Sequence, residues 1–111
     1  MRATLIATRQ FDVMISELLT EDELADLEFA LAVRPEAHPI IPGTGGVRKM
    51  RWARSGMGKR GGIRVIYYYA ADLKAALLMT AYAKNVQENL NNDQKKVIRK
   101  IRDRFEESLK Q

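Results

Sequence analysis

The spacing of apolar residues changes its period along the first part of the chain, and each change predicts an element. Residues 3–8 are rich in β-formers, with Leu5 alternating against Thr4 and Ile6, which predicts a first strand. From Phe11 the apolar residues recur at helical spacing, which predicts an amphipathic helix. These residues are Phe11, Met14, Ile15, Leu18 and Leu19.

A second helix is expected to begin after Thr20. Thr20 with Glu23 three residues later has the form of a capping box, in which each side chain bonds the other residue's backbone N–H. Its inward residues are Leu24, Leu27 and Leu31. Pro35 is expected to end the helix, and the proline- and glycine-rich stretch 34–46 predicts a loop.

Three strands are expected next. In the first, over 47–53, Met50 and Trp52 share one face while Lys49 and Arg51 share the other. The second runs over 63–69, with Ile63, Val65, Tyr67 and Tyr69 on one face and Arg64, Ile66 and Tyr68 on the opposite one. The tip between them is rich in glycine and carries cations, which predicts a hairpin.

The third strand is expected over 73–84. Its alternation places one set of residues on each face: Leu78, Thr80, Tyr82 and Lys84 on one side, and Leu77, Met79 and Ala81 on the other. A terminal amphipathic helix follows, with Asn91 and Gln94 at its start and apolar residues at helical spacing through Leu109. The order predicts one α+β domain spanning 1–111, with an antiparallel-dominated sheet, two N-terminal helices and a C-terminal helix.

Composition narrows the chemistry. The chain has 111 residues, no cysteine and a single histidine, which excludes thiolate nucleophiles and zinc sites built on sulfur. His38 lies in the predicted loop, where a surface role is the more ordinary one. No leader or membrane span is recognised, so a cytoplasmic protein without membrane contact is expected. No cofactor is expected, although a magnesium-dependent nuclease stays open as an alternative.

Charge is concentrated in the middle of the chain. The formal net charge is +5, and the residues from 48 to 64 include no acid. The basic residues of this segment are Arg48, Lys49, Arg51, Arg54, Lys59, Arg60 and Arg64. A block of this kind attracts a polyanion, because neutralised phosphates release counterions. A merely solubilising face is the simpler reading, but the alternation of these charges within strands favours binding.

RNA carries its own nucleophile in the 2′-hydroxyl, so a protein that cleaves it needs a base, cations for the phosphorane and a proton donor. Lys49, Arg51, Arg64 and Lys84 supply the cations if they converge on one face of the sheet. Tyr82 and Tyr68 are suited to stack on bases or relay a proton. A non-catalytic module that binds RNA or a protein through the same basic block is the alternative.

Three ordered motifs carry a resemblance to a known family. They are PGTGGVRKMRW over 42–52, GKRGGIRVIYY over 58–68 and YAKN over 82–85. With the order of elements, they resemble the HigB branch of the RelE superfamily, the toxins of bacterial type II toxin–antitoxin modules. The resemblance implies a microbial-ribonuclease-like fold and a metal-independent, ribosome-dependent mRNA endoribonuclease that blocks translation. It also implies a cognate antitoxin, expected to be of the helix-turn-helix type.

The resemblance further implies roles for individual residues. Lys49 or Arg51 would activate the 2′-hydroxyl, Arg64 would stabilise the phosphorane, and Lys84 would serve the leaving group. Tyr82, chosen for its ability to relay a proton and not from the resemblance, is the fifth candidate catalytic residue. The residues expected to bind RNA or the ribosome are Arg48, Arg54, Lys59, Arg60 and Tyr68.

The chain departs from the family pattern at three points. Position 51 is arginine where the family has lysine, position 84 is lysine where it has arginine, and no tyrosine follows Tyr82. Because arginine is a poor base, Lys49 is the better candidate for that role.

Overall fold

A computed structural model describes residues 2–54 and 61–110. The elements in chain order are β1 (Thr4–Ala7), α1 (Arg9–Leu18), α2 (Glu21–Val33), β2 (Arg48–Ala53), β3 (Gly62–Ala70), the short 3-10 turn η2 (Ala71–Leu73), β4 (Ala75–Ala83) and α3 (Asn92–Leu109). This order confirms the predicted α+β class.

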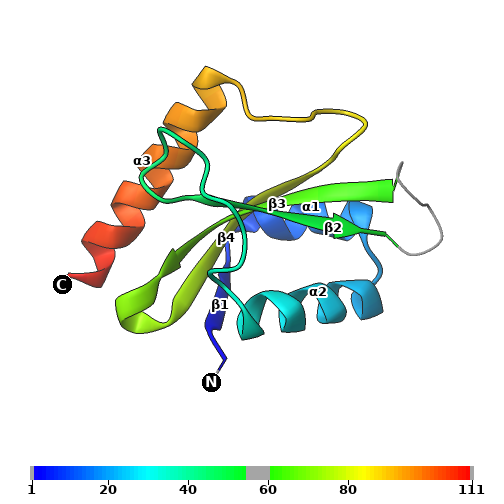
Figure 1. The fold of residues 1–111 in the computed structure, drawn as a ribbon, viewed down its shortest axis with the longest axis horizontal. Helices are drawn as coiled ribbons and strands as arrows, with labels where there is room; N and C mark the ends of the chain where they lie inside the picture. Colours follow the sequence, from blue (N-terminus) through cyan, green and yellow to red (C-terminus); the bar gives the residue numbers. More distant parts are fainter. Residues whose placement is uncertain (1, 55–60, 111) are drawn as a thin grey trace.

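The strands form one mixed sheet in the order β1-β4-β3-β2. β1 runs parallel to β4, while the β4–β3 and β3–β2 pairs are antiparallel. Figure 1 shows α3 on one side of the sheet and α1 and α2 on the other. We call these sides the α3 face and the α1/α2 face.

Each face of the sheet has its own core. On the α1/α2 face the buried residues include Phe11, Ile15, Leu27, Leu31, Met50, Ile63, Val65, Tyr67, Leu78 and Ala81. On the α3 face they include Val47, Ile66, Tyr68, Leu77, Met79, Tyr82, Leu90 and Ile98. A sheet covered on both faces buries every side chain of its central strands, which explains why β3 and β4 are apolar almost throughout.

Capping side chains define where the helices begin. The predicted capping box of α2 is confirmed: Glu23 N–H donates to the Thr20 hydroxyl at 3.2 Å, and Thr20 N–H donates to the Glu23 carboxylate at 3.1 Å. The predicted start of α3 is confirmed in the same way by Asn91 and Gln94. α1 begins earlier than its apolar pattern indicates, because the Thr8 hydroxyl accepts from Phe11 N–H at 3.1 Å.

The predicted third strand is present as β4, but its start and its two faces differ from the prediction. It begins at Ala75 and not at residue 73, because η2 and Lys74, in the left-handed region at φ 50°, precede it. Its faces also change phase at a bulge: Ile66 pairs with Thr80 and Tyr67 with Leu78, so Met79 is an extra residue. Tyr82 therefore lies on the α3 face, whereas Leu78 lies on the opposite one.

The loop between α2 and β2 is ordered and lies beside β2. Lys49 N–H donates to the Pro39 carbonyl at 3.0 Å, and Ile41 N–H donates to the Val47 carbonyl at 2.8 Å. The buried Thr44 hydroxyl donates to the Ile41 carbonyl at 2.6 Å. These bonds hold residues 39–42 against the sheet, next to the strand that carries Lys49.

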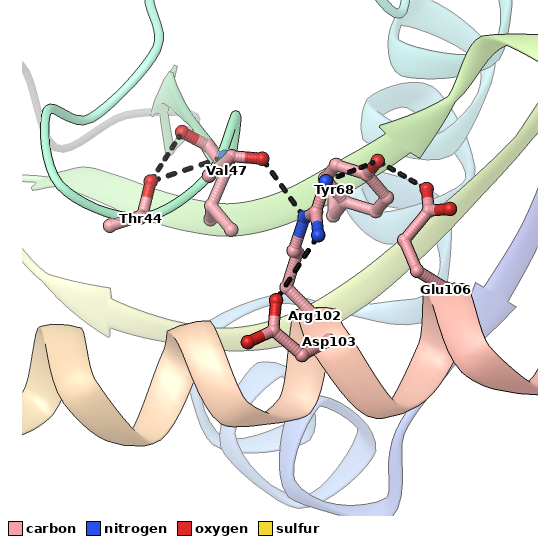
Figure 2. A network of polar contacts seen from close by, with 7 residues as sticks. Thr44, Val47, Tyr68, Arg102, Asp103 and Glu106 are labelled. Atoms are coloured by element: carbon pink, nitrogen blue, oxygen red, sulfur yellow. Dashed lines mark hydrogen bonds and ion pairs between the residues drawn. The ribbon is translucent and has the colours of Figure 1, made fainter.

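Arg102 of α3 ties this loop to the α3 face (Figure 2). Its Nε donates to the Gly45 carbonyl at 2.9 Å, and its guanidinium lies 5.0 Å from the centroid of the Tyr68 ring. The Tyr68 hydroxyl donates in turn to the Glu106 carboxylate. Gly45 has a φ of 75°, and a Cβ there would lie 3.2 Å from Arg102 Nε, so glycine suits both the turn and the close approach.

Replacing Arg102 by methionine is expected to lower the free energy of unfolding by about 1–2 kcal/mol, because a charge-assisted hydrogen bond and the contact with Tyr68 are lost. Urea denaturation measures the change. The exposed Arg99→Met on the same helix removes the same charge and serves as control. Equal losses in the two variants would contradict a specific role for the Arg102 contacts.

Candidate nucleic-acid cleavage site

Three cations meet where β2 and β3 pair. Arg51 lies directly opposite Arg64, and Lys49 lies opposite Ile66, so all three basic side chains lie on the α3 face. Partial burial lowers the pKa of Lys49, and the charges of Arg51 and Arg64 lower it further. The structure thus brings together three of the four cations expected from the sequence.

Arg64 is the buried member of this cluster. Only 4% of its surface is exposed, and Nη2 contacts the Glu88 carboxylate at 3.4 Å. Nη1 reaches the carbonyl of Ile63 at the same long distance, and the buried Nε has no hydrogen-bond partner among the described residues. A buried donor without a hydrogen-bond partner costs free energy, which makes Arg64 a candidate for a functional role.

Tyr82 lies opposite Arg64 on the same face. Burial raises the pKa of its hydroxyl and Glu88 acts in the same direction, while Arg64 opposes them. The hydroxyl donates to the Glu88 carbonyl at 3.4 Å. At neutral pH this tyrosine keeps its proton beside the cations.

Lys84 is not brought into this cluster. The bonds from Val86 and Gln87 N–H to the Ala83 carbonyl turn the chain as soon as β4 ends. Lys84 N–H still donates to the Gly62 carbonyl at 2.9 Å, but its side chain is exposed beyond Tyr82. The turn explains why Lys84 does not join the cluster, since only a continued strand would keep its side chain on the same face as Arg64.

The residues expected to bind RNA do not gather at the cluster of Lys49, Arg51 and Arg64. Arg48 lies opposite Tyr67, on the α1/α2 face, and donates to the carbonyls of His38 at 2.7 Å and Glu36 at 3.2 Å. Arg54 Nε donates to the Gly61 carbonyl at 2.7 Å, at the base of the hairpin. Lys59 and Arg60 lie outside the described residues.

Tyr68 is covered by α3. It is 8% exposed, its ring packs edge-on against Phe105, and its hydroxyl donates to Glu106. Burial and the bond to Glu106 raise the pKa of this hydroxyl. In this arrangement the ring is part of the α3 contact and is not presented to a base.

A cleft of about 410 Å³ opens beside Lys49 and Arg51. We call it the basic cleft. Its lining residues are Pro39, Ile40, Ile41, Pro42, Lys49, Arg51, Asn89, Leu90 and Lys95. The loop before β2 forms one wall, and the segment leading into α3 forms the other.

Three polar residues of this region were not anticipated from the sequence. Glu88 contacts Arg64, Asn89 accepts a hydrogen bond from Lys49 Nζ at 2.9 Å, and Lys95 lines the basic cleft. Glu88 and Asn89 lie between β4 and α3, where no strand or helix periodicity indicates the direction of a side chain. For Lys95 the sequence does carry a signal, since Ile98 and Ile101 indicate which side of α3 packs on the sheet.

Within residues 2–54 and 61–110, no group of three or more histidine, aspartate or glutamate side chains is placed to hold a metal ion. In the same part of the chain, no helix has the length and apolar character needed to cross a membrane.

Comparison with known proteins identifies the family. Residues 8–111 match the model of a family described as RelE toxin of RelE / RelB toxin-antitoxin system. The chain belongs to the RelE toxin family. The family expected from the three sequence motifs is thereby confirmed at the level of RelE.

Solved structures agree with a RelE-type fold. The toxin–antitoxin complex RelBE2 from Mycobacterium tuberculosis matches with a TM-score of 0.57 at 12% identity, over 75% of this chain and 99% of that one. An arginine-to-alanine double mutant of the E. coli toxin RelE in the free state matches with a TM-score of 0.53 at 17% identity, over 79% of this chain and 90% of that one. At these identities the likeness concerns the fold.

Proposed function

We propose that this RelE-family chain is a toxin that cleaves mRNA on the ribosome and so blocks translation in the cytoplasm. The observation that carries the proposal is the cluster of Lys49, Arg51 and Arg64 beside the basic cleft, with the protonated Tyr82 next to it. The three sequence motifs place the chain in the HigB branch within this proposal. A helix-turn-helix antitoxin is the proposed partner, in line with the toxin–antitoxin complex among the structural matches.

The proposed reaction needs no metal. The 2′-oxygen of the RNA attacks the adjacent phosphorus, the bond from phosphorus to the 5′-oxygen breaks, and a cyclic phosphate is left. Lys49 accepts the 2′-hydroxyl proton, because its lowered pKa makes the neutral amine more accessible than in an ordinary lysine. Arg51 and Arg64 offer guanidinium groups to the negative phosphorane.

Protonation of the leaving 5′-oxygen is assigned to Tyr82 in preference to Lys84. Tyr82 lies opposite Arg64 and holds its proton at neutral pH, whereas the exposed Lys84 side chain has no hydrogen bond or ion pair with the cluster among the described residues. Glu88 contacts Arg64 in the free chain, and a substrate phosphate would take over that contact.

The proposal is tested with translating ribosomes. The chain is added to a reconstituted translation reaction, and the ends of the message are mapped by primer extension. New ends are expected on messages being translated and not on the same messages without ribosomes. Messages that stay whole while the chain remains bound would replace the ribonuclease with a non-catalytic RNA- or protein-binding module.

A further inference from the structure

We propose that the basic cleft binds the nucleotide next to the scissile phosphate of a single-stranded RNA, with Lys95 contacting that nucleotide's phosphate and residues 39–42 contacting its base. The inference rests on the proposed ribonuclease function, which supplies the scissile phosphate. It assigns Lys95 and the loop before β2 to substrate binding.

The charges lining the cleft favour an anion. Lys49, Arg51 and Lys95 all line it, and its lining residues include no acid. Lys95 is close enough to Lys49 for its charge to lower the pKa of Lys49. Like charges gathered in a concave, partly buried place repel one another, and a phosphate between them relieves that repulsion.

The opposite wall of the cleft, formed by residues 39–42, suits contact with an RNA base. Pro39, Ile40, Ile41 and Pro42 are apolar, and Ile40 is 52% exposed, so this surface is uncovered in the free chain. The cleft volume of about 410 Å³ lies within the range of roughly 300–1,000 Å³ that is usual for small-molecule sites. An apolar wall facing cations suits an unstacked nucleotide, which presents a flat base on one side and a phosphate on the other.

Continuity with the proposed cleavage site favours RNA over an acidic protein segment. Lys49 and Arg51 line the cleft and also belong to the cluster with Arg64. Asn89, on the α3 side, accepts a hydrogen bond from Lys49 Nζ at 2.9 Å. This bond holds the lysine between the basic cleft and the cluster with Arg64. An RNA strand that passes through the cleft thus reaches the proposed cleavage site while staying in contact with basic side chains.

The test measures binding and does not need cleavage. A short fluorescent RNA carrying 2′-O-methyl groups, which block its own nucleophile, is titrated against the full chain at several salt concentrations. Lys95→Ala is expected to weaken binding about fivefold, the contribution of one exposed ion pair. It should also reduce the slope of log K against log salt by about 0.7, as one lost phosphate contact does on a single strand.

Lys96→Ala is the matched control, because Lys96 is the next residue of α3 and is exposed outside the cleft. Equal losses in the two variants would overturn the inference. The wall is tested with Ile40→Ala, which should weaken binding of the ordinary oligonucleotide but not of an abasic one. An acidic peptide that binds as tightly, with the same dependence on Lys95, would replace the nucleotide site with a protein-docking surface.

The two proposals fail in different ways. Binding through Lys95 with messages left whole on ribosomes would refute the ribonuclease and keep the nucleotide site. Message cleavage by the chain, with Lys95→Ala and Lys96→Ala alike in affinity, would refute the nucleotide site and keep the ribonuclease.

Discussion

Arg64→Ala is expected to lower the rate of message cleavage on ribosomes on the order of 10²- to 10³-fold, the usual cost of removing one preorganised group that stabilises a transition-state charge. Arg64 is the most deeply buried cation of the cluster, and its Nη atoms make only long contacts at 3.4 Å. We therefore expect the guanidinium to form stronger hydrogen bonds with a phosphate oxygen of the substrate. Single-turnover kinetics of message cleavage measures the loss.

Two companion measurements show whether the loss is chemical. The variant is expected to fold, because removing the side chain also removes the unpartnered Nε, and its thermal midpoint checks this. Arg64→Lys should fold as well but should recover little activity, since lysine lacks the planar guanidinium. Growth arrest by Arg64→Ala equal to that of the parent chain would contradict the assigned chemistry.

Lys49→Ala is expected to lower the cleavage rate on the order of 10²- to 10⁴-fold, the usual contribution of a positioned general base. A base acts in its neutral form, so the rate should rise with pH through the pKa of Lys49. That pKa is lowered by burial first and then by Arg51 and Arg64. Arg51→Gln removes one of these charges, so the pKa rises and the ascending limb of the pH–rate profile moves to higher pH.

The exposed Lys96→Gln removes a positive charge outside the cleft and should leave the pH–rate profile where it is. An Arg51→Gln profile that falls at every pH without moving would show that Arg51 binds phosphate while another group accepts the proton.

Local signals were sufficient for most of the fold. The capping boxes at Thr20 and Asn91 predicted two helix starts, because a side-chain acceptor three residues before its donor is a purely local pattern. The alternation within β2 predicted that Lys49 and Arg51 share one face, and the register of β2 with β3 puts Arg64 on that face too. The phase of β4 could not be predicted, because both faces of that strand are buried and the bulge at Met79 leaves no polar trace in the sequence.

The candidate site was only partly accessible to sequence reasoning. Lys49 and Arg64 come together through register, which alternation indicates. Glu88, Asn89 and Lys95 arrive from a separate segment, and their approach depends on how α3 docks across the sheet. Tyr68 illustrates the opposite case, since its pattern fits an exposed stacking ring but α3 covers it.

The bulge in β4 allows that strand to lose one residue without moving the side chains of the candidate site. Because Met79 is the extra residue of the bulge, deleting it would restore strict alternation and leave the residues after it on the faces that they have now. Ala81 would still face the core under α1 and α2, and Tyr82 would still lie opposite Arg64. Homologues that lack the extra residue should therefore keep a tyrosine at the position of Tyr82, without compensating changes on either face.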